Sequence, residues 1–331
     1  MNNEKKPTVA VIFGGRGKER SVSLKGKDYL ISLIDRDKYD LKPICIEEDG
    51  RWSLDGDEIL LCEGGFYQPE RRENIRINCA FPLLHGDFGE DGVVQGALEC
   101  HNIPYVGCDT SAGAVCRDKS FVKIIAKSLE IPTLPFVSLF RGEGLDYAVR
   151  RAEEKLNYPM FIKPARLGSS IGASAARSQR ELVSALRLAF SLSERAIAEP
   201  YLSDKRELEC GYLQVKGKEI FTNPGEIKIK GVYGYDEKYL SGDTELSIRA
   251  NIGYEICEDV REYSRRLVRA LGVRDLSRVD FFLSGDELYL NEINTMPGFT
   301  EGSLYPKLIE AAGITPNRMV DMLIEGAMTR G

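Results

Sequence analysis

The chain has 331 residues, a formal net charge of −6, 43% hydrophobic residues and 29% charged residues. This length allows two or three compact domains, and the composition is that of an ordinary soluble enzyme. The acidic balance gives no general reason to expect nucleic acid as a partner, and no apolar run approaches the length of a membrane span.

The cysteines are scattered and indicate a reducing compartment. None of the eight stands in a C-x-x-C pair. Cys100, His101, Cys108 and Cys116 suggest a zinc site, but their spacing differs from that of common zinc sites. We therefore favour reduced thiols in a cytoplasmic protein.

The N-terminal segment predicts a strand, a glycine turn and a helix. Thr8–Gly15 is rich in β-branched residues and too short for a signal peptide, and a helix is expected from Glu19 to about Leu33. A dinucleotide-binding turn needs G-x-G-x-x-G, but the third glycine position is Arg20, which disfavours an NAD-dependent oxidoreductase. Local sequence alone explains Glu19 as an acid favoured by the helix dipole.

Two further strands are expected at Leu41–Glu47 and Asn78–Gly86. The second carries His85 at its end, and it is followed by an acidic, glycine-rich loop at 87–92 and a helix from Val93. Ligand sites in open α/β sheets gather at the carboxyl ends of strands, which makes His85 a candidate site residue. A histidine packed in the core explains the same pattern equally well.

A second domain is predicted after a helix over 111–130, which carries Lys119, and a proline-containing linker. Met160–Pro164 is expected to be a strand with an embedded lysine, Lys163, and the small-residue loop Ala165–Gly172 follows it. Glycine and serine can offer backbone N–H and hydroxyl groups to phosphate oxygens, while lysine supplies charge. The two lysines and the loop indicate a nucleotide site, although no Walker motif occurs.

Two strands are expected at the far side of this domain, Ala196–Leu202 and a second one from Arg206. Glu199 lies near the end of the first strand, and Glu207 lies at the start of the second. Such an arrangement can hold an adenine by backbone hydrogen bonds and a ribose by a carboxylate, with a solvated strand edge as the alternative. Farther on, Tyr233–Tyr239 predicts either a loop that closes over a reaction or an ordinary surface loop.

The stretch from Ser277 to Asn294 predicts a β-hairpin with a serine-glycine-aspartate turn. Asp280 stands on the first strand, while Glu292 and Asn294 stand two apart on the second and so point to one face. Pairing of the strands would bring three oxygen ligands together, which suits a hard cation such as Mg²⁺; solvated carboxylates are the alternative. The backbone N–H of Gly298, in the turn beyond, could face a developing negative charge.

Seven stretches, taken in chain order, resemble the D-alanine–D-alanine ligases of the ATP-grasp superfamily. They are VAVIFGGRGKERSVSL, LLHGDFGEDGVVQGALE, GCDTSAGAVCRDK, FIKPARLGSSIG, YDEKY, SRVDFF and NEINTMPGFTEGSLYP. The resemblance implies an α/β protein with the ATP-grasp fold: an N-terminal, doubly wound parallel-sheet domain and two α+β domains that clamp ATP. We place these domains at 1–117, 118–212 and 213–331.

The resemblance also implies the reaction. The γ-phosphate of ATP passes to the carboxylate of one D-alanine, and the amine of a second D-alanine displaces phosphate from the acyl phosphate. The product, D-alanyl-D-alanine, serves peptidoglycan precursor synthesis, cell-wall biogenesis and cell shape. Mg²⁺, as two ions, or Mn²⁺ in its place, would accompany ATP, and a cytoplasmic homodimer is expected.

Site residues follow from the resemblance position by position. The metal ligands would be Asp280, Glu292 and Asn294, and the lysines that contact phosphate would be Lys119, Lys163 and Lys238. Adenine and ribose would be surrounded by Glu199, Tyr201, Leu202 and Glu207.

The remaining residues would act on the two amino acids. The first D-amino acid, near His85, would be oriented by a trio of Glu19, Ser169 and Tyr239. The oxyanion site would consist of Arg278 and the Gly298 amide, and the second substrate's carboxylate would be held by Ser303 with Leu304.

Some positions depart from the family pattern. Many members have methionine at the position of Arg117, and methionine at that of Phe299. Phenylalanine there resembles the vancomycin-resistance ligases, which join D-alanine to D-serine or D-lactate. The vancomycin-resistance ligases, however, usually have the sequence S-R-Y-P at the position where this chain has S-L-Y-P, beginning at Ser303. Their D-lactate branch also tends to replace the loop tyrosine, which is present here as Tyr239. D-alanine is therefore the expected second substrate, with D-serine or D-lactate as the alternative.

Two other functional classes explain less of the sequence. An ATP-grasp ligase for unrelated substrates would keep the central and C-terminal motifs but would have no particular need for Glu19 and His85. A nucleotide-binding regulatory protein without activity should lose the metal ligands, and all three stand here.

Overall fold

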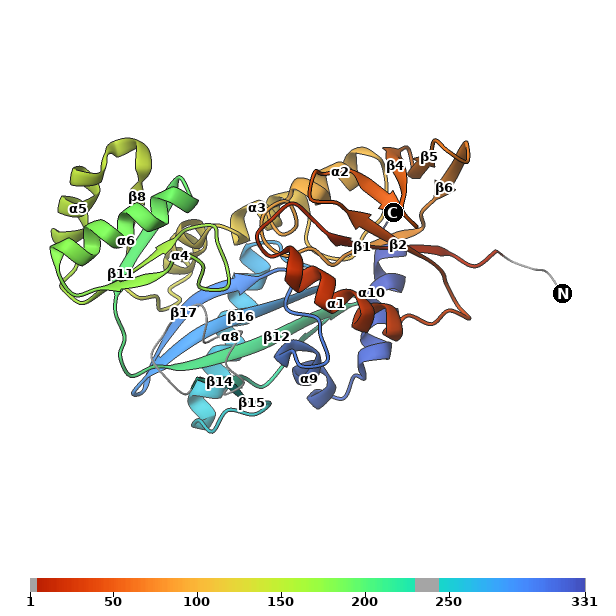
Figure 1. Ribbon diagram of the computed structural model, residues 1–331. Coiled ribbons are helices and arrows are strands. Elements are labelled where there is room, and N and C mark those ends of the chain that lie inside the picture. The colour runs from red at the N-terminus through yellow and green to blue at the C-terminus, as the bar shows by residue number, and fades with distance from the viewer. Residues whose placement is uncertain (1–4, 230–243, 331) are drawn as a thin grey trace.

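The computed structural model describes residues 5–229 and 244–330, and within them the strands form three sheets (Figure 1). Each sheet is built from a different third of the chain, in sequence order. No helix in these ranges is long and apolar enough to cross a membrane. All eight cysteines are free thiols, and the described residues contain no cluster of three or more His, Cys, Asp or Glu side chains suited to a metal.

The N-terminal sheet has seven strands in the order β6-β5-β4-β3-β2-β1-β7. The strands are β1 Thr8–Gly14, β2 Asp40–Ile46, β3 Trp52–Leu54, β4 Asp57–Cys62, β5 Gly65–Gln68, β6 Glu73–Arg76 and β7 Cys79–Pro82. β1 is buried throughout and pairs in parallel with β2 and β7. The doubly wound parallel arrangement is thus confined to these three strands.

The other four strands extend the N-terminal sheet as an antiparallel meander. Antiparallel neighbours can be joined by two-residue turns, whereas parallel neighbours need a long crossover. Asp55 and Gly56 form such a turn between β3 and β4, both with positive φ. Aspartate and glycine tolerate that backbone conformation, so the meander follows from local turn chemistry.

The helix expected over 111–130 is broken in two. It consists of α3 (Thr110–Cys116) and α4 (Lys119–Ser128). Between them, the Asp118 side chain accepts the Ser120 N–H and so caps α4. The same buried carboxylate accepts from Arg195 at 2.9 Å and Arg166 at 3.2 Å, which fixes the break against the central sheet.

The central sheet is antiparallel, with the order β10-β9-β11-β8. Its elements are β8 Val137–Phe140, the 3₁₀ turn Arg141–Glu143, α5 Leu145–Glu153, β9 Met160–Pro164, β10 Ser174–Ala176, α6 Gln179–Leu192 and β11 Arg195–Pro200. α5 and α6 bury their apolar faces against this sheet in one cluster. Lys163 therefore projects from a strand, β9, whose apolar side chains are packed against these helices.

The third sheet runs β15-β14-β12-β16-β17, with β13 paired to β12. Its strands are β12 Arg206–Val215, β13 Lys218–Phe221, β14 Gly225–Ile229, β15 Thr244–Ser247, β16 Leu276–Ser284 and β17 Glu287–Asn294; the helices are α8 Tyr254–Ala270, α9 Leu304–Ala311 and α10 Pro316–Met328. The predicted hairpin is present as β16 and β17.

Two apolar clusters bind the third sheet to its neighbours. α3, α4 and α8 pack on one side of it, while α9 and α10 share a core with α1 (Arg20–Leu33) and the N-terminal sheet (Figure 1). The boundary at 117/118 falls between α3 and α4, and that at 212/213 falls inside β12, which pairs with β16 from Arg206 to Leu213. The division into three domains stays a prediction.

Arg330 fastens the end of the α10 segment to the third sheet. Its guanidinium donates to the two carboxylate oxygens of the buried Asp275 at 2.5 and 2.6 Å, and Asp275 also accepts the Gly107 N–H at 2.7 Å. Arg330→Ala should lower the free energy of unfolding by about 1.5–3 kcal/mol, the usual contribution of hydrogen bonds to a charged group. Urea denaturation would measure it. Arg318→Ala, which removes the exposed arginine of a pair within α10, should cost less than about 1 kcal/mol, and equal losses would contradict the assignment.

Candidate active site

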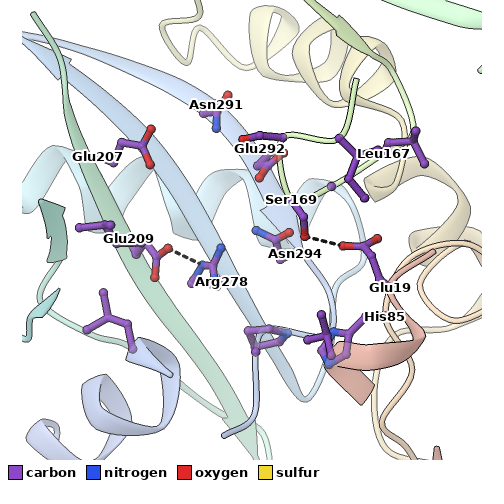
Figure 2. A pocket seen from close by; sticks show the side chains of 18 of the residues that line it. Glu19, His85, Leu167, Ser169, Glu207, Glu209, Arg278, Asn291, Glu292 and Asn294 are labelled. Atoms are coloured by element: carbon purple, nitrogen blue, oxygen red, sulfur yellow. Dashed lines mark hydrogen bonds and ion pairs between the residues drawn. The ribbon is translucent and has the colours of Figure 1, made fainter. Parts of the chain in front are cut away.

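A cleft of about 430 Å³ lies between the three sheets and collects side chains from each of them (Figure 2). It is lined by most of the predicted site residues: Glu19, His85, Lys119, Lys163, Ser169, Glu207, Arg278, Glu292, Asn294, Gly298, Ser303 and Leu304. Glu199, Tyr201, Leu202 and Asp280 are not among its lining residues. Lys238 and Tyr239 lie outside the described residues.

The hairpin sets the register of the predicted metal ligands. Asp280 on β16 pairs directly with Glu292 on β17, and Arg278 pairs with Asn294. The Asn294 side-chain amide donates to Asp280 Oδ2 at 2.9 Å. One strand pairing thus places both carboxylates and the amide together, with Glu292 and Asn294 exposed to the cleft.

The charges of both carboxylates are balanced by cations of the chain. Lys119 Nζ lies 2.9 Å from Glu292 Oε2, and the Arg278 guanidinium donates to both oxygens of Asp280 at 2.7 Å. Two carboxylates and an amide oxygen are the donors that Mg²⁺ prefers. The residues present therefore fit a hard divalent cation.

Arg278 is held between two buried carboxylates. Besides Asp280, its Nε lies 3.2 Å from Glu209 Oε1, the pair drawn in Figure 2. Burial alone would lower the pKa of Arg278, but Asp280 and Glu209 outweigh it and raise the pKa well above its ordinary value. Sequence reasoning missed Glu209, although its spacing of two from Glu207 places both on one face of β12.

Behind the cleft wall, a buried carboxylate holds two lysines. Glu199 lies 2.7 Å from Lys163 and 2.6 Å from Lys123, and Lys163 also donates to Asn291 Oδ1 at 3.0 Å. Burial raises the pKa of Glu199, but Lys123 and Lys163 together lower it to about 2. Its side chain therefore positions Lys163 from behind. Lys123 was missed, although it stands four residues after Lys119 and so on the same helix face.

The loop after β9 presents Ser169 to the N-terminal part of the cleft. Ser169 and Ser170 adopt positive φ, at +54° and +57°, which non-glycine residues rarely do. The Ser169 hydroxyl donates to Glu19 Oε1 at 2.9 Å (Figure 2). This joins two members of the predicted trio. Strained backbone at a ligand-facing loop is typical of functional sites.

His85 lies beside Glu19 in the same part of the cleft (Figure 2). Burial lowers its pKa to about 4, against the opposing effect of Glu19, so the imidazole is neutral at pH 7. Its Nε2 is buried and makes no hydrogen bond to the residues that the structure describes. A neutral ring with an unsatisfied nitrogen is suited to a small polar ligand.

The turn before α9 forms the remaining wall. A Cβ on Gly298 would lie 3.1 Å from Ser303 Oγ, which itself accepts the Thr300 N–H at 3.0 Å. α9 begins at Leu304, and Ser303 and Leu304 line the cleft, so a helix N-terminus, which favours a carboxylate, lies at its edge. Phe299, in contrast, is fully buried and packs on the rings of Phe81 and others in the N-terminal core.

Comparisons with known proteins agree along nearly the whole chain. Residues 8–108 match the family model described as D-ala D-ala ligase N-terminus, and residues 125–325 match that described as D-ala D-ala ligase C-terminus. The D-alanine–D-alanine ligase of Caldicellulosiruptor bescii is 36% identical over 97% of this chain and 95% of its own. The D-alanine–D-alanine ligase of Deinococcus radiodurans is 39% identical over 98% of this chain and 99% of its own.

Solved structures give the same result. D-alanyl-alanine synthetase A from Vibrio cholerae has a TM-score of 0.90 at 27% identity, covering 98% of this chain and 99% of its own. The VanG D-Ala:D-Ser ligase from Enterococcus faecalis has a TM-score of 0.87 at 32% identity, covering 97% of this chain and 99% of its own. The D-alanine–D-alanine ligase from Bacillus anthracis complexed with ATP has a TM-score of 0.78 at 28% identity, covering 99% of this chain and 98% of its own.

Proposed function

Because the chain belongs to the D-alanine–D-alanine ligase family, we propose that it joins two D-alanines to D-alanyl-D-alanine with ATP, for peptidoglycan precursor synthesis. One observation carries the proposal: a single cleft holds lysines from the central part, carboxylates from the third sheet and Glu19 from the N-terminal part. A reaction that combines a triphosphate with two amino acids needs these three kinds of group in one place.

The first step activates a carboxylate. ATP gives its γ-phosphoryl group to a D-alanine carboxylate oxygen, which leaves ADP and D-alanyl phosphate. Lys119 and Lys163 supply positive charge to the phosphates, and the loop with Ser169 supplies N–H groups. Tyr201, Leu202 and Glu207 hold adenine and ribose, with Lys238 as a further phosphate contact. Glu199 keeps Lys163 in position.

Asp280, Glu292 and Asn294 would hold Mg²⁺, as two ions or with Mn²⁺ in its place. When bound, the metal neutralises charge on the phosphates. Arg278 and Lys119 pair with Asp280 and Glu292, so repulsion between the two carboxylates of the hairpin is compensated by cations of the chain.

The second step forms the peptide bond. The amine of the second D-alanine attacks the acyl phosphate carbonyl, the carbon–oxygen bond to phosphate breaks, and phosphate and a proton leave. Arg278 and the Gly298 N–H face the oxyanion that develops, and Ser303 with Leu304 hold the second carboxylate. Glu19, Ser169 and Tyr239 orient the first substrate beside His85.

D-alanine is the second substrate that the site supports best. The phenylalanine that resembles vancomycin-resistance ligases is Phe299, and its ring is buried in the core and does not line the cleft. Phe299 therefore offers no direct contact by which the cleft would select D-serine or D-lactate.

We also propose that the protein is cytoplasmic and forms a homodimer. Light scattering of the purified protein would test the homodimer.

Product mass tests the proposed function directly. The purified protein, with ATP and Mg²⁺, should release phosphate with D-alanine alone and form D-alanyl-D-alanine as the main product from an equimolar mixture of D-alanine, D-serine and D-lactate. Mass spectrometry of the products measures this, and L-alanine is the control that should give none. A dominant mixed product would reassign the second substrate, and no D-alanine-dependent phosphate release would refute the ligase.

A further inference from the structure

Arg117 lies at the break between α3 and α4, and its side chain is buried. Its guanidinium reaches three carboxylates that lie far from it in sequence. Nη2 is 3.2 Å from Glu19 Oε2 and 3.5 Å from Asp87 Oδ1, and Nη1 is 3.4 Å from Glu90 Oε2. The break between the helices, which the Asp118 cap creates, thus lets the Arg117 side chain point toward the N-terminal part of the cleft.

These carboxylates need a cation. Glu19 and Glu90 are both about nine-tenths buried, and Asp87 is half-exposed. Burial raises the pKa of Glu90 to about 7, with Arg117 lowering it and Glu19 raising it. His85 supplies no charge, because it is neutral at pH 7. Arg117 therefore compensates a crowded group of acids in surroundings where unpaired charge is costly.

Arg117 and Ser169 hold the two oxygens of Glu19 from opposite sides. Oε1 accepts from the Ser169 hydroxyl at 2.9 Å, and Oε2 accepts from Arg117 at 3.2 Å. The backbone closes around the same carboxylate, since a Cβ on Gly86 would lie 2.3 Å from Oε2 and one on Gly168 would lie 2.9 Å from Oε1. Removing Arg117 would leave the Ser169 hydroxyl, which holds Oε1, to orient the carboxylate.

We propose that Arg117 is a positioning residue for the first D-amino acid, which it serves by fixing the Glu19 carboxylate toward the substrate's ammonium group. This rests on the proposed function, in which Glu19 orients the first substrate. In the part of the chain that the structure describes, Arg117 forms ion pairs with Glu19, Asp87 and Glu90, all from the N-terminal part of the cleft, so ATP binding should not depend on it.

Arg117→Met tests the proposal. Initial rates measured over a wide range of D-alanine give separate Michaelis constants for the first and second D-alanine. The constant for the first should rise about 10- to 100-fold, as expected for loss of a hydrogen bond to a charged group, while those for the second D-alanine and ATP stay unchanged. Arg117→Lys keeps the charge but loses the fork, so its rise should be smaller.

Two further variants control for folding. Arg141→Met removes an exposed arginine of the central part and should change none of the constants. Glu90→Gln with Arg117→Met removes one buried acid together with the cation; it should fold even where the single variant does not, and it should still bind the first D-alanine weakly.

An unchanged constant for the first D-alanine in folded Arg117→Met, or in Glu90→Gln with Arg117→Met where the single variant does not fold, would overturn the role of Arg117. Equal rises in all three constants would do the same, because a general loss of structure would then explain them. Failure of the unsubstituted protein to make D-alanyl-D-alanine would instead refute the proposed function.

Discussion

Lys123→Met should lower the free energy of unfolding by about 3–5 kcal/mol, the usual loss when one partner of a buried ion pair is removed. The Lys123 side chain is fully buried and Glu199 is 1% exposed, so water cannot replace the lost partner. Glu199 would keep Lys163 alone, at 2.7 Å. Urea denaturation followed by circular dichroism would measure the loss.

A substitution of the other partner, Glu199, tests whether the two residues are coupled. Glu199→Gln should also lower the free energy of unfolding, because it leaves two lysines without their shared carboxylate. The double variant, Lys123→Met with Glu199→Gln, should lose less free energy of unfolding than the sum of the two single losses. Arg151→Met breaks a half-exposed pair with Glu143 in the same part of the chain and should cost less than about 1 kcal/mol. Strict additivity of the two buried substitutions would contradict the coupling.

The same pair predicts part of the acid sensitivity. The folded pKa of Glu199 is about 2, below its ordinary value of about 4.3. The stabilisation from its ionised form is therefore complete above about pH 4.3 and is lost as the pH falls toward 2. In Glu199→Gln, the free energy of unfolding should fall less steeply than in the unsubstituted protein over this range.

Local patterns predicted the parts of the site that lie on single strands. The hairpin over Ser277–Asn294 is present as β16 and β17, because alternation and turn residues fix both the strands and their register. The side of β17 on which Glu292 and Asn294 lie followed from the two-residue period. These are properties that neighbouring residues decide.

Other features depend on contacts that a local pattern does not contain. The break at Asp118 was missed because it is fixed by Arg166 and Arg195, one from a loop and one from β11. The sequence suggests Phe299 as a residue that bears on substrate choice, but its ring is buried in the N-terminal core. The two lysines that share the carboxylate of Glu199 come from α4 and β9, and the sequence around Glu199 does not contain these contacts.

The meander β3–β6 was not predicted, although the Asp55-Gly56 pair between two apolar runs is a strong signal for a tight hairpin turn. The strands there are short and half-exposed, so their apolar periodicity is weak. Turn chemistry would have been the better guide than periodicity in this segment.

Arg278→Met should reduce kcat by about 10²–10³-fold, the range seen when one donor to a developing oxyanion is removed. It should also destabilise the fold, because Glu209 and Asp280 face each other in register on β12 and β16, both more than nine-tenths buried. Arg278 now lies 3.2 Å from the first and 2.7 Å from the second. Rapid-quench measurement of phosphate and dipeptide, with urea denaturation in parallel, would record both effects.

Arg278→Lys distinguishes the two roles of the side chain. Lysine keeps a positive charge between Glu209 and Asp280 but cannot donate to both oxygens of Asp280 in parallel. The free energy of unfolding should therefore recover much of the loss seen with methionine, while kcat stays far below that of the unsubstituted protein. If kcat returned together with stability, charge alone would be sufficient and the directed donor at the oxyanion would be ruled out. If neither variant changed kcat by tenfold, Arg278 would have no part in the peptide-forming step.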